Sequence, residues 1–260
     1  MKKFGLIEYP KKESLSYKVF NSYFKAANIK ATYEDIVIEP SEFDNKIQNY
    51  IQNYDGLNIT VPFKEVVIKY IDIIEDAKEI NAVNCIYKNK GYNTDWKGFY
   101  YSLKFPLVEP ILLIGAGGAS KSIVYALYKK GVKEIYLTNR TKEKAEKLKK
   151  FFSDKIEIKV EPFENLKSIV RGSKTLINAT SIGMFQESFY LDENDLLNLS
   201  LIYDIVYNHT PLQKTAQKLK INCLDGKSFW FYQAVENLKI WDIYNEEIFN
   251  NVFKKVVRGE

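Results

Sequence analysis

An apolar run of four residues leads directly into a glycine-rich loop, and this pairing constrains the fold more than any other feature. The run is Ile111–Ile114, and the loop reads Gly115-Ala116-Gly117-Gly118-Ala119-Ser120 before a helix-like segment begins. An apolar run of this length is typical of a buried parallel strand, and the order of strand, glycine loop and helix is the context of a dinucleotide-binding loop. The alternative interpretation is a strand-to-helix turn that binds nothing.

The residues of this loop have separate tasks if it binds a dinucleotide. Gly115 permits the tight turn, and Gly117 lets the backbone approach a pyrophosphate whose charge the helix N-terminus stabilises. The third glycine of the common fingerprint is replaced in this chain. The loop residues expected to bind the cofactor are Gly115, Ala116, Gly117, Gly118 and Ala119.

The end of the next expected strand indicates which dinucleotide fits. The residues there are Asn139-Arg140-Thr141, with Lys144 close behind. NAD enzymes usually carry Asp or Glu at this point to hold the ribose 2′-hydroxyl, and a carboxylate there repels a 2′-phosphate. A guanidinium instead stacks on adenine and contacts the phosphate, so Arg140 favours NADP. The alternative for Arg140 is an ordinary surface arginine.

Strand-like and helix-like segments alternate along almost the whole chain. In the second half, repeated βα units predict a parallel sheet covered on both faces, and Gly131 is expected to end one of the helices. We expect strands there over residues 111–114, 134–139, 155–160, 175–178 and 201–205, and helices over residues 119–130 and 142–152.

The first half has the same α/β character, and the best boundary between the two halves is residues 106–110. Lys88-Asn89-Lys90-Gly91 is predicted to turn between two β-like runs. Ser41 is expected to cap a helix that runs toward Tyr54, and Pro62 to begin a short helix through Ile68. The other elements expected are strands over residues 4–9, 32–38 and 57–60 and a helix over residues 16–28.

Composition excludes several classes of protein. The net charge of +5 is mild, and the lysines alternate with glutamates, so no nucleic-acid partner is expected, although a positive field favours anionic small molecules. No apolar window approaches a membrane span, and Glu8 interrupts the first apolar run too early for a signal peptide. Two distant cysteines, Cys85 and Cys223, indicate a reduced, cytoplasmic protein, and one histidine excludes a His-rich metal site.

One lysine and one aspartate stand out among small polar side chains in the first half. Lys64 follows Gly56-Leu57-Asn58-Ile59-Thr60-Val61-Pro62-Phe63, and Asp95 ends Asn93-Thr94-Asp95. With the glycine loop next in the chain, they suggest a proton-donor pair in front of a nicotinamide. Each residue taken alone is more often an ordinary surface side chain.

These motifs, taken in order, resemble shikimate dehydrogenases over essentially the whole chain. The segments that carry the resemblance are Ser14-Leu15-Ser16, residues 58–64, Ala82-Val83-Asn84-Cys85, residues 91–95, the glycine loop, Asn139-Arg140-Thr141, residues 178–184, Asp204-Ile205-Val206-Tyr207 and Gln233-Ala234. The resemblance implies an α/β substrate domain over residues 1–105, completed by C-terminal helices within residues 228–260. It implies a Rossmann-like NADP domain with a parallel sheet over residues 106–227.

The resemblance also implies an activity and a set of site residues. The activity is NADP-dependent, reversible reduction of 3-dehydroshikimate to shikimate, by a monomer or a homodimer. Lys64 and Asp95 are the implied catalytic pair, since the Lys64 ammonium can protonate the oxygen that receives a hydride, and Asp95 favours its charged form. The implied substrate-binding residues are Ser14, Ser16, Thr60, Asn84, Tyr207 and Gln233, and Ile205 and Gly226 join the implied cofactor residues.

The chain departs from the family pattern near its start, and alternatives stay open. Glu13 and Tyr17 stand where the family carries His and Pro, and Glu13 brings a negative charge close to an expected carboxylate site. Ser14 and Ser16 have the alternative role of capping the first helix. His209 is expected to be solvated rather than catalytic. The alternatives for function are a dehydrogenase that accepts quinate or uses NAD, and a catalytically weakened NADP-binding regulator.

Overall fold

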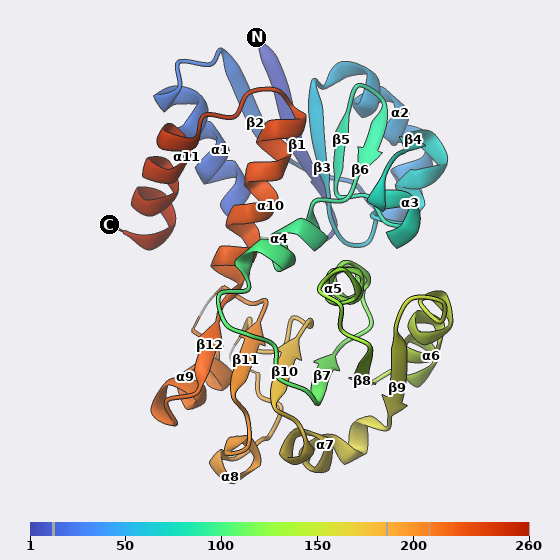
Figure 1. Cartoon of the computed structure of the whole chain (residues 1–260). Coiled ribbons are helices and arrows are strands. Elements are labelled where there is room, and N and C mark those ends of the chain that lie inside the picture. The colour runs from blue at the N-terminus through green and yellow to red at the C-terminus, as the bar shows by residue number, and fades with distance from the viewer. Residues whose placement is uncertain (12–13, 186, 208, 260) are drawn as a thin grey trace. The chain divides into compact units, whose positions relative to one another are not determined.

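The computed structural model describes residues 1–11, 14–185, 187–207 and 209–259. The chain packs into two compact units, residues 1–94 with 233–260, and residues 95–232. Each unit is built on a six-stranded sheet (Figure 1). The α/β fold class predicted from the sequence is confirmed, because one sheet is mixed and the other entirely parallel.

The first unit holds the mixed sheet, with strand order β2-β1-β3-β5-β6-β4. The strands β1, β2 and β3 run parallel, whereas β5 pairs antiparallel with both β3 and β6. Its strands are β1 (Lys2–Glu8), β2 (Ala31–Val37), β3 (Gly56–Ile59), β4 (Asp72–Ile73), β5 (Cys85–Tyr87) and β6 (Lys90–Tyr92), and its helices include α1 (Leu15–Ala26), α2 (Phe43–Asn53), α3 (Asp76–Ile80) and α11 (Glu246–Phe253), followed by a π-helical turn over Lys254–Arg258.

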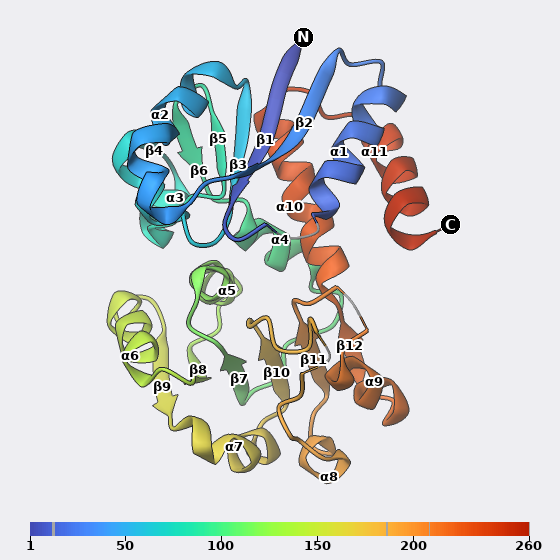
Figure 2. The same cartoon turned by 180° about the vertical axis from the view of Figure 1, so that it is seen from behind.

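The period-2 pattern of the strands sends two different sets of side chains to the two faces of this sheet. Apolar residues such as Ile7, Leu57 and Ile59 pack against α2 on one face. On the opposite face, aromatic rings of α1 contact Phe4, Tyr33 and Trp241, which follows α10 (Gly226–Ile240). The helices α1 and α11 lie beside each other along this second face in both views (Figures 1 and 2).

The second unit holds the parallel sheet, with strand order β12-β11-β10-β7-β8-β9 (Figure 2). The order reverses direction at β7, which pairs with β10 on one side and β8 on the other. Its strands are β7 (Ile111–Ile114), β8 (Glu134–Thr138), β9 (Glu157–Glu161), β10 (Thr175–Asn178), β11 (Leu201–Asp204) and β12 (Asn222–Leu224), and its helices are α4 (Asp95–Ser102), α5 (Gly118–Lys129), α6 (Lys142–Phe151), α7 (Leu166–Gly172), α8 (Glu193–Leu196), α9 (Pro211–Lys218) and the start of α10.

Helices cover both faces of this parallel sheet, as predicted. On one face, Leu112, Leu176 and Ile202 form a core with side chains of α7, α8 and α9. On the other face, the Tyr203 ring lies 4.7 Å from the ring of Phe99 in α4, and α4 packs on α5. Both faces are therefore buried, which explains why its central strands read as continuous apolar runs.

Most predicted elements are present within one or two residues, and the predicted turn between β5 and β6 has positive φ at Lys88 and Asn89. Two predictions at helix starts are wrong. Ser41 does not cap α2, because it lies inside a 3-10 turn (Pro40–Glu42) and α2 begins at Phe43 without a side-chain cap. Pro62 does not begin a helix, since a turn occupies residues 61–62 and a 3-10 helix starts only at Val66. Both segments tighten into 3-10 geometry, which local sequence patterns do not distinguish from an α-helical start.

No helix among the described residues is long and apolar enough to cross a membrane. Within the same part of the chain, no group of three or more His, Cys, Asp and Glu side chains could hold a metal ion.

Candidate active site

In the first unit, the two expected serines lie at the start of α1. The Ser14 hydroxyl accepts a hydrogen bond from the Ser16 backbone N–H at 3.1 Å, so the capping role considered for Ser14 is confirmed. The Ser14 hydroxyl also hydrogen-bonds the Asp35 carboxyl, and the Ser16 side chain hydrogen-bonds the Tyr33 phenol. Both serines are thus held by β2 as well as by α1. Glu13, which precedes them, lies outside the described residues.

The turn after β3 places Thr60 and Lys64. The backbone N–H of Thr60 donates to Ile7 O at 3.0 Å, and the N–H of Phe63 donates to Thr60 O at 2.8 Å. Phe63 is buried and its ring stacks on Phe43, with centroids 4.2 Å apart and planes 6° from parallel. Because Phe63 is buried in the core, the backbone next to it is held in place. The neighbouring Lys64 is half-buried.

Asn84 and Gln233 are 149 positions apart in the sequence, and the fold brings them into direct contact. Asn84 Nδ2 donates to Gln233 Oε1 at 3.0 Å and to Thr94 Oγ1 at 2.9 Å. The Thr94 hydroxyl lies 2.7 Å from Asn237 Oδ1. Thr94 and Asn237 were not predicted from the sequence as members of this network. Asn237 follows Gln233 by four positions in α10, and this helical spacing is the signal that places both on one face.

A second branch of the network runs through Asn58, which was also not predicted as a site residue. Asn58 Nδ2 donates to Asn84 O at 3.1 Å, and Asn58 Oδ1 accepts from the Tyr33 phenol at 2.8 Å. The sequence signal was an amide side chain inside the otherwise apolar strand β3. Through Tyr33, this branch connects Asn84 to Ser16, so one continuous set of hydrogen bonds joins three expected substrate residues.

Two carboxylates lie close to this network and were not predicted there. Glu8 is buried at the end of β1. Asp35 Oδ1 is buried without a hydrogen-bond partner among the described residues, and burial raises the Asp35 pKa against the opposing effects of Lys11 and Ser14. Burial raises the Tyr33 pKa well above its usual value, and both carboxylates add to this effect. An anionic ligand near Ser14 therefore has acidic neighbours.

The glycine loop of the second unit has the geometry that its sequence predicts. Gly115 has φ +110°, a left-handed conformation, and a Cβ there would lie 2.8 Å from Thr180 Cγ2. A Cβ at Gly117 would have no atom within 4 Å, so open space lies in front of this residue. Gly118 and Ala119 are the first residues of α5, whose leading amides have no intrahelical acceptor. This helix start can therefore receive an anion.

Asn139 ties this loop to the next one. Asn139 Oδ1 accepts from the Ala116 backbone N–H at 3.1 Å, and Asn139 Nδ2 donates to Thr141 O at 2.8 Å. Thr141 is the N-cap residue of α6, and Arg140 and Lys144 are exposed on either side of it. The structure thus gathers the loop residues and the basic residues expected for a 2′-phosphate within one unit.

Ile205 and Gly226 meet where β11 ends and α10 begins. A Cβ on Gly226 would overlap the Ile205 carbonyl, so only glycine permits this backbone approach. Asp204, immediately before, holds the loop: Asp204 Oδ2 accepts from the Thr210 hydroxyl at 2.7 Å, and Oδ1 accepts from Asn178 Nδ2 at 2.9 Å. Burial raises the Asp204 pKa, and these hydrogen bonds oppose the rise. Tyr207 is half-buried on this loop, and His209 is exposed as expected.

Asp95 is the first residue of α4 and its side chain is buried. A carboxylate in the first turn of a helix interacts favourably with the helix dipole.

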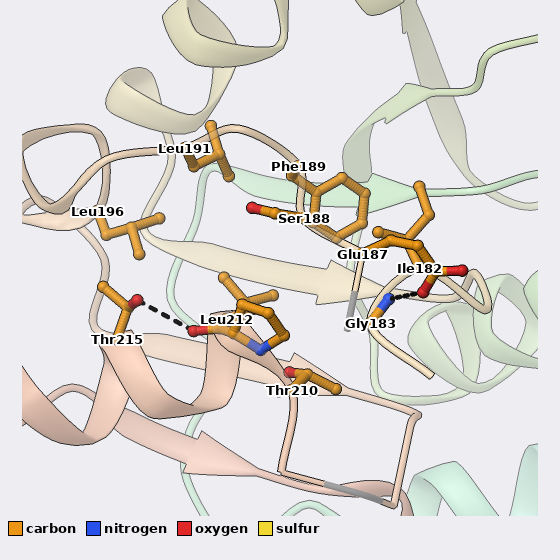
Figure 3. A pocket seen from close by; sticks show the side chains of 11 residues that line it. Ile182, Gly183, Glu187, Ser188, Phe189, Leu191, Leu196, Thr210, Leu212 and Thr215 are labelled. Atoms are coloured by element: carbon orange, nitrogen blue, oxygen red, sulfur yellow. Dashed lines mark hydrogen bonds between the residues drawn. The ribbon is translucent and has the colours of Figure 1, made fainter. Parts of the chain in front are cut away.

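A small cavity of the second unit contains none of the expected site residues. The loop after β10 and the start of α9 enclose it, with Ile182, Phe189 and Leu212 among its walls (Figure 3). The Glu187 carboxylate accepts from the N–H groups of Gly183 and Phe185 at 3.2 and 3.0 Å, and these bonds lower its pKa. The cavity lies within the packing that fixes this loop on α9.

Two family models match the chain in the order of these two sites. The model described as "Shikimate dehydrogenase substrate binding domain" matches residues 6–86, and "Shikimate / quinate 5-dehydrogenase" matches residues 105–186. "Shikimate dehydrogenase (NADP(+))" of Thermotoga maritima is 42% identical over 98% of this chain and 100% of its own length. The chain belongs to the shikimate dehydrogenase family. The resemblance stated from the sequence is confirmed.

Solved structures of the family have the same fold. The crystal structure of shikimate dehydrogenase from Thermotoga maritima aligns with a TM-score of 0.91 over 98% of this chain and 99% of that one. Shikimate 5-dehydrogenase from Listeria monocytogenes, solved with shikimate and NAD, is 25% identical and aligns with a TM-score of 0.84 over 98% of this chain and 96% of that one. The mixed and parallel sheets are therefore the family's architecture, with an N-terminal substrate domain and a Rossmann-like domain.

Proposed function

We propose that this chain is an NADP-dependent shikimate dehydrogenase, which reduces 3-dehydroshikimate reversibly to shikimate in the biosynthesis of aromatic amino acids. The observation that carries the proposal is the 42% identity to a relative named "Shikimate dehydrogenase (NADP(+))" across 98% of this chain. A match of this extent spans the polar network of the first unit and the glycine loop of the second.

The residues of the second unit fit NADP. Open space in front of Gly117 and the start of α5 suit the pyrophosphate, and Gly115 supplies the turn. Arg140 and Lys144 are exposed, and no carboxylate follows β8 directly to repel a 2′-phosphate. The Asn139 side chain joins the two loops through hydrogen bonds to the backbone of Ala116 and Thr141. We therefore propose that it maintains the shape of the cofactor site.

Lys64 and Asp95 carry the acid–base step in this proposal. The chemistry that bound NADPH supplies is a hydride for the carbonyl carbon of 3-dehydroshikimate. The Lys64 ammonium donates a proton to the oxygen that becomes a hydroxyl, and it stabilises the negative charge that develops there. Asp95 is the second member of the proposed catalytic pair. In shikimate oxidation, Lys64 accepts the proton instead.

Recognition of the substrate rests on short polar side chains. Ser14 and Ser16 provide hydroxyl donors for the carboxylate, and Asn84 and Gln233 provide amides for the ring hydroxyls. Thr60 and Tyr207 complete the proposed set. A small polyol with one carboxylate needs many such groups and little apolar surface.

Two alternatives stand beside this function, and one of them has specific support. The Listeria relative was solved with NAD, and one family model includes quinate in its description, so a dehydrogenase that uses NAD or accepts quinate is the second candidate. A catalytically weakened NADP-binding regulator is the third candidate, and the presence of both Lys64 and Asp95 speaks against it.

The domain limits, location and assembly state belong to the proposal as well. We propose a substrate domain over residues 1–105 with helices from residues 228–260, and a cofactor domain over residues 106–227. A cytoplasmic location is supported by Cys85 and Cys223, which form no disulfide in the described part of the chain. The protein acts as a monomer or a homodimer.

One steady-state experiment separates the candidates. The purified protein is assayed for oxidation of shikimate and of quinate, each with NADP⁺ and with NAD⁺. The proposal expects the highest kcat/KM with shikimate and NADP⁺. A higher value with quinate or with NAD⁺ selects the second candidate, and no turnover with any pair, despite NADP⁺ binding, selects the regulator.

A further inference from the structure

Thr94 lies at the centre of the polar network of the first unit and is buried, with 1% of its surface exposed. Its backbone N–H donates to Asn84 Oδ1 at 2.7 Å. A backbone N–H can only donate, so the Asn84 atom that faces it must be the amide oxygen. This N–H is one of two contacts with Thr94 that orient the Asn84 amide, and the Thr94 hydroxyl, which faces Asn84 Nδ2, is the other.

The direction of the remaining hydrogen bonds follows from this one. Both hydrogens of Asn84 Nδ2 are committed, one to Thr94 Oγ1 at 2.9 Å and one to Gln233 Oε1 at 3.0 Å. The Thr94 hydroxyl has a single proton, and it lies 2.7 Å from Asn237 Oδ1 but 3.3 Å from Asn84 Oδ1. The shorter contact takes the proton, which leaves the hydroxyl lone pairs to accept from Asn84.

The Gln233 amide is consequently presented in one orientation. Its oxygen is occupied by Asn84, so its Nε2 group, which donates to no residue in the described part of the chain, is the end left for a ligand. Gln233 is the first residue of the part of α10 that belongs to this unit. It is half-buried, so its side chain is partly exposed to solvent.

We propose that Thr94, supported by Asn237, is a positioning residue that sets the polarity of the Gln233 amide, so that Gln233 offers a hydrogen-bond donor to one ring hydroxyl of the substrate. The inference rests on the proposed function, because it takes shikimate as the ligand. The substrate hydroxyl that contacts Gln233 must accept a hydrogen bond from Gln233 Nε2. A substrate with an ammonium group in its place has no lone pair and is rejected.

The test compares Thr94→Val with Thr94→Ser. Valine has the shape of threonine and keeps the backbone N–H but lacks the hydroxyl, whereas serine keeps both. We expect Thr94→Val to raise the KM for shikimate about five- to tenfold, the effect of one lost hydrogen bond. The KM for NADP⁺ should stay within about twofold, and Thr94→Ser should match the wild type within about twofold on both substrates.

Substrate analogues separate positioning from a general loss of structure. A set of deoxyshikimates is used, each of which lacks one ring hydroxyl. Gln233→Ala should not change the KM for the analogue that lacks the hydroxyl partner of Gln233, and this identifies that analogue. On that analogue the KM penalty of Thr94→Val should disappear. An equal penalty on every analogue, or an equal penalty for Thr94→Ser, overturns the proposal.

A measurement on the unaltered protein covers the case in which Thr94→Val does not fold. In an NMR spectrum with ¹⁵N-labelled glutamine, the signal absent in Gln233→Ala identifies the Gln233 Nε2 group. The proposal expects one Nε2 proton to shift downfield when shikimate is added, and an unchanged signal in the presence of saturating shikimate overturns it. Wild-type protein that binds no shikimate overturns the proposed function itself, which is a separate result.

Discussion

The indole of Trp241 lies directly against the backbone of Gly56 in the first unit. A Cβ on Gly56 would come within 2.5 Å of Trp241 Nε1, and the indole N–H donates to Ile86 O at 3.3 Å. The end of α10 is thus seated on the central strand β3 of the mixed sheet. This contact joins residues far apart in the sequence and holds α10, the helix that carries Gln233 and Asn237.

Gly56→Ala should destabilise the protein. The added methyl must displace a buried indole, and overpacking of this kind costs roughly 1–3 kcal/mol. In a chain of this size, we expect the melting temperature to fall by about 2–4 °C per kcal/mol. Gly172→Ala is the matched control, because a Cβ at Gly172 has no atom within 4 Å. Equal melting temperatures for the two variants would show that the contact between Gly56 and Trp241 does not limit stability.

Arg140→Ala should weaken NADP⁺ binding far more than NAD⁺ binding. Loss of one charge-assisted contact to the 2′-phosphate costs on the order of 1.5–3 kcal/mol, and NAD⁺ has no phosphate there. The measurement is the KM for each cofactor at saturating shikimate. Lys147→Ala, which removes an exposed cation of α6, serves as the control. An equal loss for both cofactors removes the basis for assigning Arg140 to the phosphate.

Lys64→Ala should nearly abolish turnover and leave NADP⁺ affinity unchanged. The loss of a general acid costs roughly 10²–10⁴ in rate, and Lys64 belongs to the first unit, whereas the glycine loop belongs to the second. Turnover is measured by steady-state kinetics and affinity by calorimetry. The control is Lys69→Ala, since Lys69 is exposed and pairs with Asp44 at 2.9 Å. Retention of more than about a tenth of the wild-type rate contradicts the role of Lys64.

Asp35→Asn should stabilise the protein at neutral pH. Burial raises the Asp35 pKa in the folded state above its ordinary value of 3.8, so the ionised carboxyl is disfavoured by folding. The resulting destabilisation is absent below pH 3.8 and develops as the pH rises through the folded-state pKa. The gain is at most about 1 kcal/mol, since solvent partly screens this carboxyl.

Thermal unfolding measured at neutral and acidic pH tests this expectation. Asp35→Asn should melt above the wild type at neutral pH, and the two curves should converge as the pH falls toward 4. Glu34→Gln, on the adjacent position of the same strand, is the control. A stabilisation that is equal at every pH would assign the effect to packing instead of charge.

Glu13→Gln should change the KM for shikimate less than about threefold, because an exposed charge interaction is worth only ~0–1 kcal/mol. Lys11 and Lys12 immediately precede Glu13 in the sequence, and their positive charges oppose the effect of Glu13 on an anionic substrate. Steady-state kinetics over a range of shikimate concentrations measures the effect. A tenfold or larger fall in KM would show that Glu13 faces the substrate carboxylate and would reopen the question of the preferred substrate.

Local sequence patterns predicted most elements and the cofactor loop. The apolar strand Ile111–Ile114 and the tight turn at Gly115 depend on adjacent residues, so the sequence predicted both, and Gly115 has φ +110° in the structure. The Ser14 cap is a contact across two positions and was foreseen as one alternative. The starts of α2 and of the segment after Pro62 were predicted wrongly, because short 3-10 turns use the same residues as α-helical starts.

What the sequence by itself determined is therefore the order of strands and helices, the glycine loop and the family, since each rests on contiguous residues and their spacing. Only the tertiary structure decided that Asn84 meets Gln233, that Thr94 sets their polarity, and that the partly buried Asp35 carboxyl lies beside Ser14. The physical reason is that these contacts depend on which faces of distant elements meet. The spacing of apolar side chains along a helix or strand specifies which face is buried, but not which distant element packs against that face.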